Sequence, residues 1–314
     1  MSKSLVEELE AIASQGDTMV TIGVFDGVHL GHQRLLQRLL QRARERGLHS
    51  AALFFVQHPS TVLSPGTRIP LITLPEERAA LLRGLGVQYV KGISFRADVS
   101  LLTARQFVEL LRQHLRMQGL IVGPDFALGH KREGTVERLS VLGREMRFTV
   151  EVVPPLTQSS TVVSSTAIRQ ALAAGDVRGA ARMLGRPFRL TGPVVRGEGR
   201  GKALGYPTAN VAFDAERALP ADGVYATRAV IGGGAYDSAT NVGLRPTFAG
   251  KQRTVEAYVM DFHRDIYGET VGLDFVDMLR PEERFSSVEA LKEQIARDVL
   301  DARARLRALA AEKR

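Results

Sequence analysis

Two histidines three residues apart, His29 and His32, are the side chains that most directly suggest chemistry in this sequence. They follow an apolar run, Val20 to Phe25, which predicts a buried strand, and they stand where a leucine-rich helical pattern begins. The unpaired N–H groups of a helix start attract phosphate, and imidazoles can donate hydrogen bonds to a phosphorus centre that gains charge. The pattern therefore indicates nucleotidyl transfer. A metal-binding pair, or two surface histidines, is the plainer alternative.

The segments around these histidines predict a parallel sheet. The helix presents an apolar stripe and ends near Gly47, and another apolar run at 49–56 predicts the next strand. The alternation continues, with helices expected at 76–83 and 103–117 and strands at 89–93, 120–122 and 148–153. Such alternation predicts a doubly wound, Rossmann-like sheet, whose ligands bind beyond the carboxyl ends of its strands. The two histidines lie at such an end.

Two later segments of this half could also bind phosphate. Residues 123–134, GPDFALGHKREG, follow a strand and combine glycines with two cations, although an exposed basic turn has the same composition. Residues 163–169, VSSTAIR, place three hydroxyl side chains one turn before an arginine: Ser164, Ser165, Thr166 and Arg169. Hydroxyl residues at a helix start ordinarily cap it, at a gain of about 1 kcal/mol, but together with arginine they can hold a phosphate.

The second half has a different pattern, which begins after Gly185-Arg186-Pro187. A helix is expected at 166–184, and beyond it short runs of period two predict strands at 188–195, 224–231, 236–242, 254–262 and 270–279. We place the domain boundary at residue 186, with domains of 1–186 and 187–314. Short strands separated by glycine and proline turns predict a small closed β-barrel, followed by a helix at 288–310.

The loop at 197–210, GEGRGKALGYPTAN, is the candidate phosphate loop of the second half. Its glycines and lysine, Gly199, Gly201, Lys202 and Gly205, could wrap a polyphosphate, although a glycine-rich loop alone is more often a flexible turn. Thr208 and Asn210 offer neutral oxygens on one side of an extended segment, as Mg²⁺ held largely by substrate phosphates requires.

Glu256 is the candidate general base of the second half. It lies in a predicted strand with apolar residues on both faces, so it must be paired, functional or turned to solvent. A carboxylate there could accept the proton of an attacking hydroxyl, which contributes roughly a hundred- to ten-thousand-fold in rate. An edge-strand surface glutamate is the alternative.

The composition limits the class of protein. The 314 residues are enough for two cores, and 44% hydrophobic and 24% charged residues are typical of a globular chain. The absence of cysteine excludes disulfides and thiolate metal sites, and together with an amino-terminal segment unlike a signal peptide it predicts a cytoplasmic protein. The net charge of +8 is ascribed to solvated helix faces at 34–46 and 297–307, not to a nucleic-acid surface, because tryptophan is absent and aromatic residues are few.

The chain resembles a known family in both halves. Residues 23–32, GVFDGVHLGH, resemble the HxGH nucleotidyltransferase signature in the form found in prokaryotic FAD synthetases, and residues 123–134 and 163–169 resemble its later motifs. The glycine loop followed by PTAN resembles the riboflavin kinase signature. In order and spacing the whole resembles the prokaryotic bifunctional riboflavin kinase and FAD synthetase family. Val56 and Gln57 stand where that family usually has an acidic residue and a proline.

The resemblance implies two reactions and assigns the residues to them. The second domain would phosphorylate riboflavin with ATP to give FMN, with Glu256 as base and Thr208 and Asn210 at Mg²⁺. The first would transfer AMP from ATP to FMN, giving FAD and pyrophosphate, with His29 and His32 as catalytic residues. Nucleotide contacts are expected at Gly23, Phe25, Gly31, Asp125, Ser164, Ser165, Thr166, Arg169, Gly199, Gly201, Lys202 and Gly205.

Two alternatives stay open at this point. Val56 and Gln57 motivate a riboflavin kinase whose first domain is impaired or retargeted. The basic charge motivates a flavin- or nucleic-acid-binding protein that has kept the fold without turnover. We expect ATP, riboflavin and FMN as the partners, and no nucleic acid, membrane or obligate protein partner.

Overall fold

The structure is a computed structural model that describes residues 4–12, 14–64, 66–158, 160–197, 199–247 and 250–311. By its internal contacts the chain divides into two units, Met1–Ser165 and Thr166–Arg314. The predicted boundary at residue 186 lies further along the chain. The difference arises because two helices, α8 (Ser165–Ala173) and α9 (Val177–Leu184), contribute most of their contacts to the second unit.

The first unit is built on a parallel sheet of five strands. In chain order they are β1 (Thr18–Gly23), β2 (His49–Phe55), β3 (Tyr89–Ile93), β4 (Met117–Val122) and β7 (Thr149–Val152). Their order across the sheet is β3-β2-β1-β4-β7, and every neighbouring pair is parallel. The predicted doubly wound sheet is confirmed.

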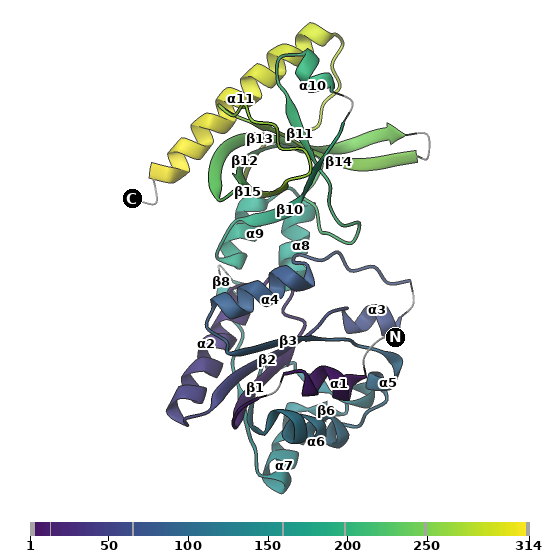
Figure 1. Ribbon diagram of the computed structural model, residues 1–314, viewed down its shortest axis with the longest axis vertical. Helices are drawn as coiled ribbons and strands as arrows, with labels where there is room; N and C mark the ends of the chain where they lie inside the picture. Colours follow the sequence, from purple (N-terminus) through teal and green to yellow (C-terminus); the bar gives the residue numbers. More distant parts are fainter. Residues whose placement is uncertain are drawn as a thin grey trace. The chain divides into compact units, whose positions relative to one another are not determined.

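Helices cover both faces of this sheet (Figure 1). On one face, α2 (Leu30–Glu45) and α4 (Pro75–Gly84) bury Leu36, Leu39 and Leu82 against Met19 and Phe54. On the other, α1 (Leu5–Glu10), α6 (Ala104–Leu115) and α7 (Val136–Met146) pack against the side chains that alternate with these along the strands, such as Val20 and Ile22. A strand buried on both faces explains the continuous apolar runs of the sequence.

Shorter elements complete the loops of the first unit. They are α3 (Pro59–Leu63), α5 (Ala97–Ser100), a 3-10 turn at His130–Arg132, and two small hairpins formed by β5 (Ala127–Leu128) with β6 (Gly134–Thr135) and by β8 (Thr157–Gln158) with β9 (Thr161–Val162).

The second unit contains a closed antiparallel barrel of six strands, ordered β10-β11-β14-β13-β12-β15. The strands are β10 (Phe188–Val195), β11 (Thr208–Val211), β12 (Gly223–Ile231), β13 (Gly234–Thr247), β14 (Gly250–Val259) and β15 (Thr270–Pro281). A one-turn helix, α10 (Arg200–Ala203), lies in the loop before β11. The predicted barrel is confirmed.

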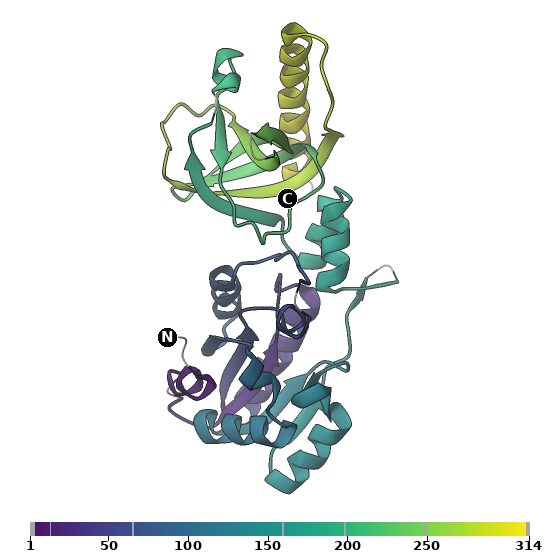
Figure 2. The same cartoon turned by 90° about the vertical axis from the view of Figure 1, so that its right-hand side faces the viewer.

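A long carboxy-terminal helix, α11 (Val288–Ala311), packs on the outside of this barrel, as Figure 2 shows. Its Ala302 and Leu306 are fully buried and join Ala226, Ala239 and Met260 in one apolar cluster. The predicted helix at 288–310 is therefore confirmed. None of the described helices combines the length and the apolar character needed to cross a membrane.

Two predicted helices have different limits in the structure. The helix expected at 103–117 ends at Leu115, because Arg116 takes a left-handed conformation (φ 50°) and Met117 begins β4. The helix expected at 166–184 is two helices, because Gly175 has φ +79° and Asp176 caps α9 by accepting a hydrogen bond from the Gly179 N–H. Only glycine adopts such a backbone easily, so the chain turns there.

Candidate active sites

Three residues of the loop between β1 and α2 have a positive φ angle. Phe25 and Val28 have φ values of 51° and 42°, and Gly27 between them has 83°. A bulky residue at positive φ is strained, and such strain persists only where the surroundings hold it in place. Phe25 and Val28 are both buried, so their side chains help to fix this loop, which leads directly into the two histidines.

Asp26 anchors the same loop from inside the protein. Its side chain is 1% exposed and accepts hydrogen bonds from the backbone N–H groups of Ile72 (3.1 Å) and Thr73 (2.9 Å) and from the Thr73 hydroxyl (3.1 Å). The Thr73 hydroxyl oxygen in turn accepts a hydrogen bond from the Gly27 N–H at 2.8 Å. The carboxylate at position 26 thus has a structural role.

The two histidines are brought together at the start of α2. His29 is the N-cap of the helix, and its Nδ1 accepts a hydrogen bond from the backbone N–H of His32 at 3.3 Å. A neutral ring that accepts at Nδ1 carries its proton on Nε2. The two imidazoles are stacked, with centroids 3.6 Å apart and planes inclined by 18°. The glycine at position 31 allows this, because a Cβ there would lie 3.1 Å from the His29 ring.

The electrostatics keep His32 neutral. Burial lowers its pKa well below the usual 6.5, and the neighbouring His29 and Arg78 lower it further. Its Nδ1 is buried and has no hydrogen-bond partner among the described residues. A buried polar atom without a partner costs free energy, and it is what a site awaiting a polar ligand shows. His32 therefore presents a neutral ring at the positive end of a helix, stacked on His29.

Of the predicted hydroxyl cluster, Ser165 is the residue that the structure joins to this loop. Its hydroxyl donates a hydrogen bond to the backbone carbonyl of Asp26 at 2.8 Å. Ser164 precedes it, while Thr166 and Arg169 continue along α8, which belongs by its contacts to the second unit. The nucleotide contacts expected of Ser164, Thr166 and Arg169 remain predictions.

A cavity of about 560 Å³ opens beside the end of β1. Two predicted contacts, Gly23 and Asp125, line it together with Phe55, Phe95 and Phe107. Phe55 and Phe95 meet edge to face, with ring centroids 5.3 Å apart. At the rim lies the turn His130–Arg132, in which Lys131 and Arg132 have φ values of 52° and 61°. An apolar slot with a cationic rim suits a flat aromatic ligand that carries an anionic group.

In the second unit, the predicted kinase residues meet on one face of the barrel. Asn210 of β11 and Asn241 of β13 both stand opposite Glu256 of β14, one on each side. Directly opposed residues of antiparallel strands share a face, so the three side chains form a row. The Thr208 hydroxyl lies 3.5 Å from Oε2 of Glu256.

This row lies on the outer face of the barrel, the face that α11 covers elsewhere. Val255, Ala257 and Val259 of β14 are buried, and Glu256 and Tyr258 alternate with them. Tyr258 packs against the cluster that contains Ala302 and Leu306 of α11. Glu256 therefore points to the same side as this helix and is only partly buried, within reach of a substrate.

The glycine loop passes close to the row. A Cβ on Gly197 would lie 2.3 Å from Nδ2 of Asn210, and one on Gly201 would lie 3.1 Å from Oγ1 of Thr208. Gly199 and Gly205 have positive φ values of 72° and 89°, with open space where a side chain would stand. The loop thus approaches the row by its backbone, as a phosphate loop does. The side chain of Lys202, and the whole of Phe248, lie outside the described part of the chain.

Comparison with known proteins gives each unit a family. Residues 11–167 match the model of the FAD synthetase family, and residues 184–306 match that of riboflavin kinase. The bifunctional riboflavin kinase/FMN adenylyltransferase of Escherichia coli K12 is 37% identical over 293 residues, which cover 93% of each chain. The protein of that name from Pseudomonas fluorescens is 40% identical over 288 residues, covering 91% of this chain and 92% of the relative.

This chain belongs to the bifunctional riboflavin kinase/FMN adenylyltransferase family. A crystal structure described as a macrolide-efflux protein from Streptococcus pneumoniae has the same fold, with a TM-score of 0.88, 33% identity and coverage of 94% of this chain and 97% of its own. This chain has both domains, in the order that the sequence motifs predicted.

The sequence did not reveal several residues of the two sites. The anchor of the histidine loop, formed by Thr73 and Arg78, joins segments about fifty residues apart and has no local signature. In the kinase unit, the sequence did not indicate that Asn241 is a neighbour of Glu256. Nor did it indicate Glu282, whose carboxylate lies so close to Gly243 that a Cβ there would be 2.5 Å from Oε1.

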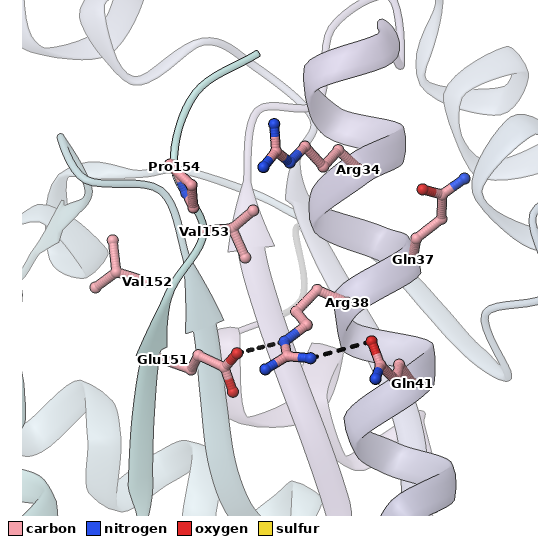
Figure 3. Close-up of a pocket in the computed structure, with 8 residues that line it drawn as sticks. All are labelled: Arg34, Gln37, Arg38, Gln41, Glu151, Val152, Val153 and Pro154. Atoms are coloured by element: carbon pink, nitrogen blue, oxygen red, sulfur yellow. Dashed lines mark hydrogen bonds and ion pairs between the residues drawn. The ribbon is translucent and has the colours of Figure 1, made fainter.

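The arginines of α2 are more than a solvated face. Figure 3 shows that Arg38 bonds to Glu151 of the edge strand β7 and to Gln41 on its own helix. Arg42 donates to the other Glu151 oxygen at 2.6 Å. These pairs tie the helix to the edge of the sheet, while Arg38 and Arg42 keep 31% and 34% of their side-chain surface exposed. Arg34 is exposed in the groove that the figure shows.

Proposed function

We propose that this chain makes FAD from riboflavin in two ATP-dependent steps, one in each unit, with the residues that the sequence predicted. The carboxy-terminal unit transfers the γ-phosphoryl group of ATP to the riboflavin 5′-hydroxyl, giving FMN and ADP. The amino-terminal unit transfers AMP from a second ATP to FMN, releasing pyrophosphate. The observation that carries the proposal is the pair of separate constellations, stacked imidazoles at a helix start in one unit and a Glu-Asn-Thr row in the other.

In the adenylyl transfer, a phosphate oxygen of FMN attacks the α-phosphorus of ATP and the bond to pyrophosphate breaks. Negative charge grows on the oxygens of the α-phosphate and on the leaving group. His29 and His32 donate hydrogen bonds to these oxygens, and the start of α2 adds its partial positive charge. Both rings act here as donors that stabilise charge, not as bases, which agrees with the low pKa of His32 caused first by burial and then by His29 and Arg78.

The apolar cavity is the proposed flavin site of this unit. Its phenylalanine walls fit the isoalloxazine ring, and its edge at Ile22–Val24 adjoins the histidine loop, so that a phosphate at that end faces the α-phosphorus. This cavity also argues against the alternative of an impaired first domain, because Val56 and Gln57 do not fill it. Gln57 instead accepts a hydrogen bond from the Phe95 N–H at 3.3 Å.

In the phosphoryl transfer, Glu256 accepts the proton of the riboflavin 5′-hydroxyl as that oxygen attacks the γ-phosphorus. Thr208 and Asn210 offer neutral oxygens beside this carboxylate, which fits Mg²⁺ bound mainly through ATP phosphates. When bound, the metal neutralises charge on the phosphates. The residues of the chain orient the hydroxyl and hold the polyphosphate along the glycine loop.

Three single substitutions test the assignment. We expect His29→Ala and His32→Ala to lower the rate of FAD formation from FMN and ATP by at least about a hundredfold, because each removes a donor to the growing charge. FMN formation from riboflavin should keep its rate in both. Glu256→Ala should do the reverse. Chromatography of the products from riboflavin or FMN with ATP and Mg²⁺ measures both rates in one chain.

Each variant carries its own control, since the reaction of the other unit reports that the protein is folded and correctly measured. A loss of both activities in any one variant would contradict the two-site assignment.

We keep residue 186 as the proposed limit between the catalytic domains, supported by the start of β10 at Phe188 and of the riboflavin kinase match at residue 184. The predicted cytoplasmic location stays a prediction.

A further inference from the structure

Arg78 of α4 is a charged side chain with no exposure to solvent. Burying a guanidinium is expensive, and a hydrophobic residue of similar volume often stabilises a protein equally well or better. A buried arginine is therefore weak support for stability as such. Its contacts indicate another role.

The guanidinium joins three segments that are distant in the sequence. Nη1 donates to the carbonyl of Phe55 at 2.9 Å, and Nη2 donates to the carbonyl of Thr73 at 3.1 Å and to the carboxylate of Asp26 at 3.4 Å. The group also stacks over the ring of Phe54, 5.4 Å from its centroid. The end of β2, the chain before α4 and the histidine loop thus meet at one cation.

Two of these contacts reach the parts of the unit that are proposed to bind the two substrates of adenylyl transfer. Phe55 lines the proposed flavin cavity, and Asp26 holds the left-handed loop that ends in His29. We propose that Arg78 is a positioning residue for FMN adenylylation, which fixes the histidine loop relative to the wall of the flavin cavity. The inference rests on the proposed roles of the histidines and the cavity, and it adds a residue that touches neither substrate.

The geometry explains why a precise link is needed here. The attacking oxygen and the α-phosphorus must be held about 3 Å apart, and a displacement of about 1 Å costs on the order of a hundredfold in rate. The strained loop at Phe25–Val28 does not keep its shape without support, and Arg78 with Thr73 supplies it. The same cation acts, with His29, on the titration of His32, so the pH dependence of the reaction reports its presence.

The test compares Arg78→Met, Arg78→Lys and a matched control, Leu82→Ala. Leu82 is fully buried one turn further along α4, so its truncation perturbs the same helix without removing a hydrogen bond to the loop. For Arg78→Met we expect the kcat of FAD formation to fall about 10- to 100-fold with KM for FMN and ATP changed less than threefold. Leu82→Ala should keep the kcat of the folded protein, although it melts at a lower temperature.

The pH profile separates positioning from folding. Without the cation, the pKa of His32 rises, so the acidic limb of the kcat profile of Arg78→Met should move to higher pH, while Arg78→Lys keeps the limb and loses rate. Thr73→Val, which removes the hydroxyl bonded to Gly27, should also lower the kcat of FAD formation, and Thr73→Ser should retain the wild-type kcat. These two variants and Arg78→Lys decide the question if Arg78→Met does not fold.

The inference is overturned if folded Arg78→Met, or Arg78→Lys and Thr73→Val in its place, has wild-type kcat and pH profile, or if Leu82→Ala loses kcat as severely. A different result overturns the proposed function itself, namely full FAD formation by His29→Ala and His32→Ala. Riboflavin phosphorylation by the same preparations should be unchanged throughout.

Discussion

The stacked pair of imidazoles illustrates how one residue depends on its neighbours. His29 has two roles. Its Nδ1 caps the helix by accepting a hydrogen bond from the backbone N–H of His32, and its ring stacks on the ring of His32. Two charged imidazoles 3.6 Å apart would repel each other strongly, so the stack is stable with neutral rings. The site is therefore arranged for work near neutral pH or above.

We expect this neutrality to appear in the stability of the protein. The pKa of His32 is lowered by burial, so below about pH 6.5 the unfolded chain binds a proton that the folded chain does not. The folded state then loses stability as the pH falls, by at most about 1.4 kcal/mol per pH unit. The free energy of unfolding of His32→Gln should fall less between pH 7.5 and pH 5.5 than that of the wild type. Urea unfolding of both proteins at the two pH values measures this difference, and an equal fall in both proteins would contradict the prediction.

At this scale the sequence predicted much of the chemistry and little of its support. The spacing of the histidines and the PTAN segment depends on a few adjacent residues, and the structure brings the members of each group together. Asp26, Thr73 and Arg78 could not be predicted as a unit, because their contact joins a strand end to a loop 46 to 52 positions away. An aspartate beside a glycine is typical of a turn and does not indicate such distant partners.

At the scale of elements, the tie between α2 and β7 holds the helix that carries the histidines. Glu151 receives hydrogen bonds from Arg38 and Arg42. Partial burial acts to raise the pKa of this carboxylate, but the hydrogen bonds from Arg42 and Arg38 outweigh it and lower the pKa. A carboxylate whose pKa is lowered by folding stabilises the fold at pH values above its pKa in the unfolded chain, about 4.3. This contribution is lost as the pH falls through its pKa in the folded protein.

Glu151→Gln should therefore lower the free energy of unfolding at pH 7 by about 1 kcal/mol, since the pair is only partly exposed. The difference from the wild type should shrink as the pH falls below about 4.3, where the carboxylate of the wild type becomes protonated too. Chemical unfolding at pH 7 and pH 3.5 gives the two values. If the difference in free energy of unfolding were the same at both pH values, the charge of Glu151 would not contribute to stability.

The attachment of α11 to the barrel includes one nearly buried ion pair, in addition to its apolar face and the more exposed pairs Arg305–Asp277 and Arg303–Asp261. Arg280 of β15 donates two hydrogen bonds, of 2.9 and 2.8 Å, to the carboxylate of Asp298 on α11. Asp298→Asn should destabilise the second unit by roughly 2–3 kcal/mol, below the usual range for a fully buried pair because Arg280 keeps some contact with water. Thermal unfolding followed together with riboflavin kinase activity tests this, and an unchanged melting temperature would contradict it.

Elements were predicted well where the pattern of side chains is local and less well where backbone conformation decides. The strands of the sheet and barrel follow from apolar runs and from alternation. The break between α8 and α9 depends on the left-handed Gly175, and β11 is a four-residue strand, one of whose two partners, β14, lies about fifty positions further on. The proposed flavin cavity is lined by strand, helix and loop residues from five separate segments, so no single stretch of sequence predicts it.

At the scale of the whole molecule, each unit has its own core and its own proposed site. The first unit buries two apolar clusters on the two faces of its sheet, and the second buries a cluster between barrel and α11. The two reactions should therefore need nothing from each other except FMN. Loss of one site leaves the other complete.

We expect a kinase-defective chain and an adenylyltransferase-defective chain to complement each other. Neither Glu256→Ala nor His32→Ala alone should convert riboflavin to FAD. An equimolar mixture should do so after a lag, during which free FMN accumulates. Chromatography of samples taken over time follows both flavins. If the mixture makes no FAD while supplied FMN is still converted, FMN must pass within one chain.

The two units differ in how their sheets end. Every described strand of the barrel has a hydrogen-bonded neighbour on each side, whereas the parallel sheet ends at β3 and β7. Open strand edges are where misfolded chains recruit copies of themselves, and a closed cylinder offers none. In a heat-stressed cell the two activities should therefore be lost unequally. Aggregation should start from the FAD-forming unit, and FMN formation should outlast FAD formation.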